Sequence, residues 1–268
     1  MTRRAVAFRC GADTLWGMRD CAHVHGHTGL LIVSGGNEIR AGAFAGQAQI
    51  AARLAQTAGV PVFRFDRRGI GDSEGDNAGW RGSRDDLAAA LAAFRREQPS
   101  MHRVVGYGVC DAASALMLHS ADLGLDAVVL VNPWTMDEHV DNGAINHAPA
   151  ALRQRYWAKL ASPHQWWRLL SGQVNLARLW HGLGRAVRRQ GAPSLLADQL
   201  RDSLGQFHGP VTLLVAAGDR IGQQFLAQWP HDDPRLVIHP GGSHSFTDHP
   251  DTADWLIERL TEATASRH

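Results

Sequence analysis

Short, mostly apolar runs alternate along most of this chain with longer stretches in which apolar residues recur every three or four positions. The short runs predict strands buried on both faces, and the longer stretches predict amphipathic helices. The predicted strands are residues 29–34, 60–65, 103–109, 126–131, 211–217 and 235–239. The predicted helices are residues 47–57, 83–96, 111–119 and 252–264, with another helix beginning near residue 223. This alternation predicts a mostly parallel sheet with helices on both faces.

Two regions depart from the alternation. Residues 5–10 and 14–19 are strand-like runs joined by the turn tripeptide Gly11-Ala12-Asp13, which predicts a β-hairpin. The stretch that begins at Trp134 and ends at Gln206 has several helical segments, no good strand and five of the nine tryptophans. We therefore predict an α/β core made of residues 1–133 and 206–268, with a helical cap, or lid, inserted at residues 134–205.

Basic residues dominate much of this predicted cap. Residues 151–201 contain nine basic residues and a single acidic residue, Asp198. One interpretation is a solvated helical face in an arginine-rich chain, in which Lys159 is the sole lysine. The other is a cap that favours anionic or glycan-linked substrates, or an acidic partner. The sequence leaves both interpretations open.

Composition and charge exclude several classes of protein. The 268 residues are 44% hydrophobic and 20% charged, as in globular chains, and a formal net charge of +1 gives no reason to expect a nucleic-acid partner. We expect no membrane-spanning helix, because no apolar run is long enough, and no signal peptide. The three cysteines (Cys10, Cys21 and Cys110) show no pairing pattern, which favours a reducing compartment. We therefore predict a cytoplasmic protein, with its oligomeric state left open.

The strongest chemical feature is the segment Gly108-Val109-Cys110-Asp111-Ala112, at a predicted strand-to-helix junction. Some hydrolases place their nucleophile on a sharp turn there, which requires small side chains two positions before and after it. Gly108 and Ala112 meet this requirement, and cysteine replaces the more common serine. The following helix N-terminus favours a thiolate at Cys110, whereas Asp111 opposes it unless its carboxylate turns away to cap the helix. The alternative interpretation of Cys110 is a small buried apolar side chain.

A carboxylate and a histidine follow at two later strand ends. Asp219 comes just after a predicted strand, and His244 follows the last strand through a glycine-rich loop. The order nucleophile, acid, histidine is that of hydrolases with a nucleophile turn. We therefore predict a catalytic triad of Cys110, Asp219 and His244. Asp219 has an alternative role as a helix N-cap, and His239 and His249 are less suitable competitors of His244.

An oxyanion hole requires two backbone N–H groups that point at the developing charge. We expect one from Asp111, directly after the nucleophile. The other should come from the loop after the strand at 29–34, from either Gly36 or Asn37. Glycines in this loop allow the backbone to approach a substrate closely, although a plain turn would use the same residues.

The segment Asp66-Arg67-Arg68-Gly69-Ile70-Gly71-Asp72-Ser73 has the glycines of a phosphate-binding loop. It lacks the Walker lysine and the glycine spacing of dinucleotide-binding loops. We therefore expect a structural loop held by Asp66 and Arg68.

Three histidines alternate along residues 23–27 and would share one face of a strand, where they could bind zinc or copper; they are His23, His25 and His27. Only Cys21 adds a further candidate ligand nearby. We therefore interpret this segment as a solvated loop edge and expect neither a metal ion nor a cofactor.

With these residues in place, the chain resembles the α/β-hydrolase superfamily, and more closely the exosortase A system-associated hydrolase 1 family. The resemblance rests on Ile32-Val33-Ser34-Gly35-Gly36-Asn37-Glu38-Ile39-Arg40, Phe65-Asp66-Arg67-Arg68-Gly69-Ile70-Gly71-Asp72-Ser73-Glu74-Gly75, Gly108-Val109-Cys110-Asp111-Ala112-Ala113-Ser114-Ala115, Val131-Asn132-Pro133-Trp134, Gly218-Asp219 and His244-Ser245-Phe246. The Asp-x-Arg-Gly-x-Gly-x-Ser stretch is common to many hydrolases, whereas the Cys-Asp-Ala-Ala-Ser-Ala elbow with Asn-Pro-Trp is much more specific.

This resemblance covers nearly the whole chain. It implies an α/β-hydrolase fold, a cysteine nucleophile, and an association with bacterial loci for exopolysaccharide production and protein sorting. The chain departs from the family at Asn37-Glu38-Ile39, where the family tends towards proline, glutamine and tyrosine. The departure concerns substrate contacts near the predicted oxyanion loop and leaves the triad untouched.

The predicted activity is cleavage of an ester, thioester or lactone in a small-molecule acyl substrate. His244, oriented by Asp219, takes the thiol proton or holds an ion pair, and the Cys110 thiolate forms an acyl-cysteine intermediate. Amides are poorer substrates, because a thiolate leaves more readily than most amines. Two alternatives stay open: an acyltransferase with the same triad, and a non-catalytic hydrolase-like protein that binds a partner or glycan through the tryptophan-rich cap.

Overall fold

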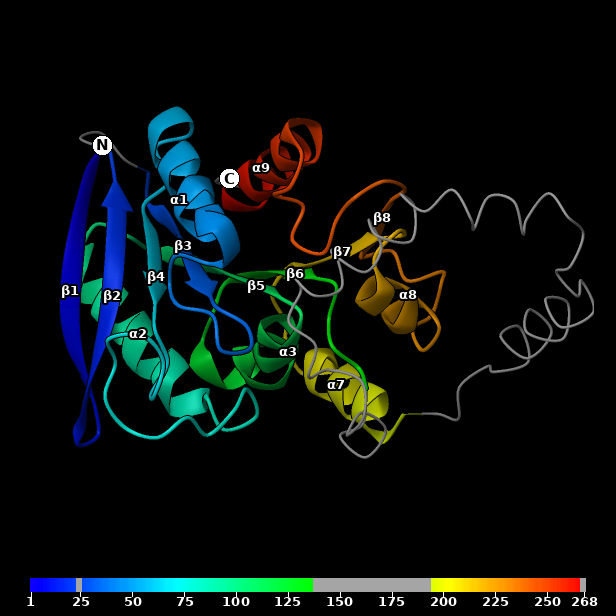
Figure 1. Cartoon of the computed structure of the whole chain (residues 1–268), viewed down its shortest axis with the longest axis horizontal. Coiled ribbons are helices and arrows are strands. Elements are labelled where there is room, and N and C mark those ends of the chain that lie inside the picture. The colour runs from blue at the N-terminus through cyan, green and yellow to red at the C-terminus, as the bar shows by residue number, and fades with distance from the viewer. Residues whose placement is uncertain (23–25, 137–193, 266–268) are drawn as a thin grey trace, which may run out of the picture. The chain divides into compact units, whose positions relative to one another are not determined.

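A computed structural model describes residues 1–22, 26–136 and 194–265 of the protein (Figure 1). In these residues eight strands form one sheet in the order β1-β2-β4-β3-β5-β6-β7-β8. The strands are β1 (Thr2–Cys10), β2 (Asp13–Cys21), β3 (Thr28–Val33), β4 (Val62–Phe65), β5 (Arg103–Val109), β6 (Ala127–Val131), β7 (Val211–Ala216) and β8 (Leu236–His239). The helices are α1 (Gly46–Thr57), α2 (Arg84–Glu97), α3 (Asp111–Leu123), α7 (Leu195–Gly205), α8 (Arg220–Leu226) and α9 (Pro250–Thr264).

The sheet is parallel except at one edge, so the predicted fold class is confirmed. The strands from β4 through β8 pair in parallel, with β3 between β4 and β5. The predicted N-terminal hairpin pairs Thr2 of β1 with Cys21 of β2, and β2 then pairs antiparallel with β4. Because parallel strands share one direction, the carboxyl ends of β3, β5, β6, β7 and β8 lie along one edge of the sheet.

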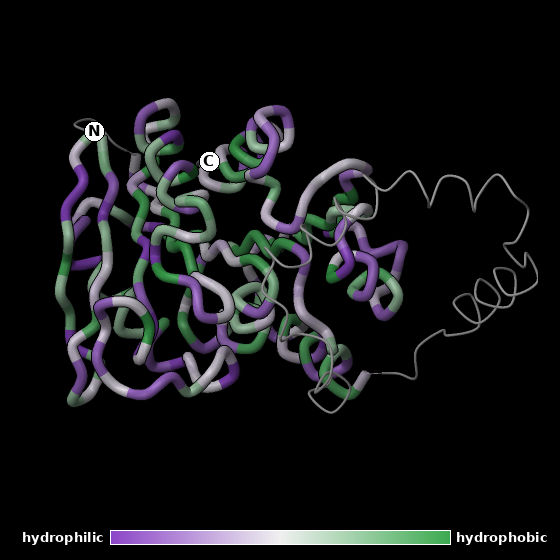
Figure 2. Tube along the Cα trace, viewed as in Figure 1, coloured by the Kyte–Doolittle hydropathy of each residue, from purple (hydrophilic) through white to green (hydrophobic). Residues whose placement is uncertain are grey.

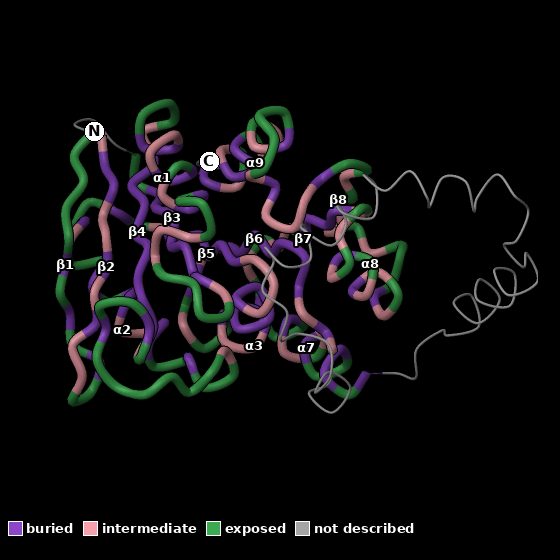
Figure 3. The backbone as a smooth tube through the Cα atoms, viewed as in Figure 1, coloured by how far each residue is buried: buried purple, intermediate pink, exposed green. Residues whose placement is uncertain are grey.

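Alternate residues of the buried strands face different helices. In β3, Leu31 and Val33 belong to the core on the side of α2, α3, α7 and α8, whereas Leu30 and Ile32 belong to the core on the side of α1 and α9. Side chains of a strand point alternately to the two faces of a sheet, so a strand covered on both faces is apolar at most positions. Figures 2 and 3 show this as hydrophobic, buried central strands beside a more exposed β1.

The chain divides into two compact units, one of Met1–Thr135 with Leu196–His268 and the other of Met136–Leu195. Helix α7 lies within the range assigned to the cap, but Leu196, Leu200 and Leu204 of this helix are buried in the core beside α2 and α3. The sequence placed this range in the cap because the alternation of strands and helices is interrupted from Trp134 to Gln206. The remainder of the predicted cap, residues 137–193, lies outside the described residues and stays a prediction.

Candidate active site

Cys110 lies at the sharp turn between β5 and α3, as the sequence predicts. Its backbone has φ 60° and ψ −124°, a left-handed conformation that a residue with a side chain rarely adopts. The turn requires glycine at position 108, because a Cβ there would lie 2.8 and 2.9 Å from the backbone carbon and oxygen of Ala112. The Cys110 N–H donates to the Val131 carbonyl at 2.9 Å and ties the turn to β6. Cys110 is partly exposed, whereas Cys10 and Cys21 are buried.

Asp219 and His244 are joined by a hydrogen bond of 3.1 Å between Asp219 Oδ2 and His244 Nδ1. Asp219 is also the N-cap of α8, where the same Oδ2 accepts from the Gly222 N–H at 2.9 Å. The two interpretations of Asp219, helix cap and histidine partner, are therefore compatible. Burial raises the pKa of Asp219, but the hydrogen bonds from His244 and Gly222 outweigh burial and hold the pKa below its ordinary value.

The imidazole of His244 faces two acidic groups, the carboxyl of Asp219 and the thiol of Cys110. Its side chain is 43% exposed. Burial lowers the pKa of His244, but hydrogen bonding to Asp219 and to Cys110, together with their charges, raises the pKa to about 10. The raised pKa of His244 thus favours a protonated imidazole beside Cys110, the arrangement found where a histidine activates a cysteine.

The other two histidines near this end of the sheet have different surroundings. The ring of His239 packs against the rings of Phe246 and Trp255, and its Nδ1 accepts from the Gly241 N–H at 3.1 Å. His249 is the N-cap residue of α9, in extended conformation. Neither shares the hydrogen bond to Asp219, which agrees with the choice of His244 from the sequence.

Asn132 supports the histidine loop, a role that the sequence analysis missed. Its side chain is fully buried, with Nδ2 donating to the His244 carbonyl at 2.8 Å and Oδ1 accepting from the Ala216 N–H at 2.9 Å. The residue also has a positive φ of 44°, which asparagine tolerates better than most residues. Its position at the carboxyl end of β6, among the strand ends that carry Cys110 and Asp219, is the signal that could have identified it.

The predicted oxyanion loop shows an unexpected contact with Asp111. The carboxylate of Asp111 accepts from the Gly36 N–H through both oxygens, at 2.8 and 2.9 Å, instead of capping α3. Buried Arg67 donates from Nη2 to the carbonyl of the same Gly36. Among the residues that the structure describes, no group accepts a hydrogen bond from the backbone N–H of Asn37 or of Asp111. Of the three predicted donors, Gly36 alone is already engaged.

Comparison with known proteins identifies the fold and the family. The model of the alpha/beta hydrolase family matches residues 23–253. The chain belongs to this family. Among solved structures, the hydrolase is similar to the alpha/beta hydrolase GrgF from Penicillium sp. sh18, with a TM-score of 0.64, 21% identity, and coverage of 99% of this chain and 100% of that one.

Two further structures show the same fold. One is XC6422 from Xanthomonas campestris, an a/b serine hydrolase without lid (TM-score 0.60, 15% identity, coverage 100% and 98%). The other is the esterase Pf2001 from Pyrococcus furiosus (TM-score 0.59, 18% identity, coverage 97% and 88%). A search of curated proteins finds no match to the hydrolase.

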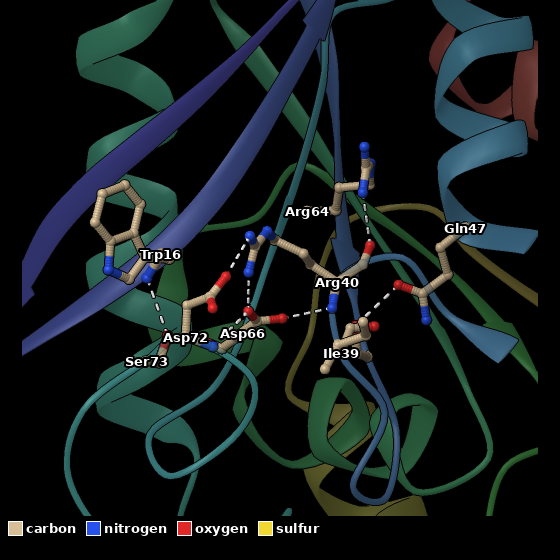
Figure 4. A network of polar contacts seen from close by, with 9 residues as sticks. Trp16, Ile39, Arg40, Gln47, Arg64, Asp66, Asp72 and Ser73 are labelled. Carbon is tan, nitrogen blue, oxygen red and sulfur yellow. Dashed lines mark hydrogen bonds and ion pairs between the residues drawn. The ribbon is translucent and has the colours of Figure 1, made fainter. Parts of the chain in front are cut away.

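Ion pairs anchor the predicted oxyanion loop of the hydrolase to the neighbouring loop 66–73 (Figure 4). Arg40 lies between two carboxylates, with Nη1 on the fully buried Asp66 and Nη2 on the exposed Asp72 at 2.7 Å. The backbone N–H of Arg40 also donates to Asp66 at 2.5 Å. Arg68 pairs with Asp86 of α2 at 2.5 Å. These contacts agree with the structural role expected for Asp66 and Arg68.

The histidine segment is described only in part by the structure. His23 and His25 lie outside the described residues. His27 Nδ1 is 2.7 Å from the Ser100 carbonyl, and its ring stacks on that of His102. Within residues 1–22, 26–136 and 194–265, no three histidine, cysteine, aspartate or glutamate side chains form a metal-binding group. In the same residues, no helix combines the length and apolar character needed to cross a bilayer.

Proposed function

We propose that the protein is a cysteine hydrolase that cleaves esters, thioesters or lactones through Cys110, His244 and Asp219. The observation that carries the proposal is the placement of Cys110 on the strained turn before α3, with His244 beside it and bonded to Asp219. Similarity to an esterase and to a serine hydrolase supports acyl chemistry. The resemblance of the cysteine elbow to the exosortase A system-associated hydrolase 1 family extends the proposal to a role beside bacterial exopolysaccharide or protein-sorting systems.

The reaction begins with His244, whose pKa is raised to about 10, taking the proton of the Cys110 thiol or already holding it in an ion pair. The Cys110 thiolate attacks the acyl carbon, and backbone N–H groups stabilise the oxyanion that forms. The tetrahedral intermediate collapses, the alkoxide or thiolate leaves, and His244 supplies its proton. Neutral His244 then takes a proton from water, which attacks the thioester and releases the acid. Asp219 keeps the imidazole oriented throughout.

The test is a panel of p-nitrophenyl esters and acyl thioesters of increasing chain length, assayed with wild type, Cys110→Ala and Cys110→Ser. We expect Cys110→Ala to lose at least about 10³-fold in kcat/KM on the preferred substrate, because no nucleophile is left. Cys10→Ala is the matched control, since Cys10 is buried beside Asp86, and it should retain wild-type turnover. Equal turnover by wild type and Cys110→Ala would remove the assignment. Product analysis with added alcohol separates hydrolysis from acyl transfer.

A further inference from the structure

The carboxylate of Asp111 occupies a place that the fold leaves open for it. A Cβ on Gly35 would come within 2.5 Å of Asp111 Oδ1, so glycine at this position makes the room that the carboxylate fills. Both carboxylate oxygens then accept from the N–H of Gly36. An acidic side chain directly after a nucleophile would normally oppose a thiolate. Here it is directed onto the neighbouring loop instead.

Arg67 binds the carbonyl group of Gly36. Its side chain is only 3% exposed, and Nη2 donates to the Gly36 carbonyl. Burial lowers the pKa of Arg67, and the negative charges of Asp111 and Asp86 oppose this effect. The N–H of Gly36 therefore meets an anion and its carbonyl meets a cation, and the two side chains partly neutralise each other across the loop.

We propose that Asp111 and Arg67 are positioning residues that clamp Gly36, and that the oxyanion is bound by the N–H groups of Asp111 and Asn37. This inference rests on the proposed function, because it assigns the donors of the same reaction. A clamped Gly36 has no N–H to offer, whereas that of Asn37 is free among the described residues. Fixing Gly36 at both ends orients the next peptide before substrate binds, which is the condition for effective oxyanion stabilisation.

The test compares two reactions of Cys110 that differ in their need for an oxyanion hole. Alkylation by iodoacetamide displaces iodide at a saturated carbon and forms no oxyanion, whereas acylation by p-nitrophenyl acetate does. In Asp111→Ala we expect the pre-steady-state acylation rate to fall at least about tenfold, a part of the 10²- to 10³-fold that loss of a whole donor costs. The rate of Cys110 alkylation on its high-pH plateau, where the thiol is fully ionised, should stay within about threefold of wild type, because Cys110 and His244 are unchanged.

Three further variants separate this effect from a general disturbance. Asp111→Asn keeps an acceptor for the Gly36 N–H and should recover most of the acylation rate that Asp111→Ala loses. Arg67→Lys keeps the buried charge but loses the planar donor, so acylation should fall while alkylation persists. Asp232→Ala, at an exposed turn before β8, is the matched control and should behave as wild type.

The outcomes distinguish the clamp from the proposed function. If p-nitrophenyl acetate acylates Cys110 of wild type, and acylates Cys110 of Asp111→Ala equally fast or faster, the clamp is wrong and Gly36 is available as a donor. If acylation and alkylation fall together, Asp111 acts on the thiolate and the clamp is again wrong. If wild type is not acylated and its Cys110 alkylates no faster than Cys10 and Cys21, the proposed function itself fails.

Discussion

The turn at Cys110 and the loop at residues 35–42 both border the candidate site, but different forces shape them. The turn depends on excluded volume, because Gly108 and Ala112 leave no space for another atom. The loop depends on charge, because Arg40 pairs with buried Asp66 and Gly36 lies between Asp111 and Arg67. The steric contact of the turn, between Gly108 and Ala112, spans a few residues, whereas the ion pairs and hydrogen bonds of the loop join residues far apart in the chain. A change of side-chain volume should therefore disturb the turn, and a change of charge should disturb the loop.

The largest effect should come from the charge that holds the loop. Asp66→Ala removes a fully buried carboxylate and leaves the guanidinium and N–H of Arg40 short of a partner. Breaking a buried pair in this way costs about 3–5 kcal/mol of unfolding free energy. Asp72→Ala removes the other partner of Arg40, whose side chain is 66% exposed, and should cost less than about 1 kcal/mol. Urea unfolding of both variants checks this, and equal losses would contradict it.

A smaller effect should follow from adding one methyl group to the turn. In Gly108→Ala the new Cβ meets the backbone of Ala112 at 2.8 Å, so the turn must shift, at a cost of about 1–3 kcal/mol. The control is Gly205→Ala at the end of α7, where a Cβ meets nothing within 4 Å. This control should lie within about 0.5 kcal/mol of wild type. Urea unfolding measures both, and an unaffected Gly108→Ala would show that the turn is not sterically fixed.

The smallest effect should be a pH dependence of the histidine pair, because the His244 side chain is 43% exposed and solvent screens its charge. The pKa of His244 is raised in the folded protein to about 10 from an ordinary 6.5. Its stabilising contribution is therefore complete below pH 6.5 and is lost as the pH rises through 10. The difference in unfolding free energy between wild type and His244→Gln should shrink over this interval, whereas that for Gly108→Ala, which involves no titrating group, should stay constant. A constant difference for His244→Gln would indicate that the ion pair is absent.

The sequence predicts the fold well because its signals are local. The strands buried on both faces are mostly apolar runs, although β4 contains the buried Arg64, and β5 matches its predicted bounds of 103–109. The sequence could not show that α7, which lies within the range predicted for the cap, packs against the core, because helical periodicity shows which face of a helix is buried and not what buries it. Leu196, Leu200 and Leu204 have the spacing of any amphipathic helix, and only the structure shows that they pack in the core.

In the candidate site, too, the features with local sequence signals were predicted and the contacts between distant residues were not. Chain order and strand ends are local signals, and the structure brings Cys110, Asp219 and His244 together. The contact between Asp111 and Gly36 joins residues 75 positions apart, and that between Arg67 and Gly36 joins residues 31 apart. Nothing in the sequence around Gly35, Gly36, Arg67 and Asp111 indicates that these residues will lie in contact. The sequence therefore left Gly36 and Asn37 as equal candidates.

Asp219 Oδ2 is shared between the first turn of α8 and the imidazole of His244. The helix thus fixes the rotamer of the carboxylate independently of the histidine. In the proposed reaction the imidazole gains and loses a proton while the helix keeps the Asp219 carboxylate in place, so little reorganisation energy is added to each proton transfer.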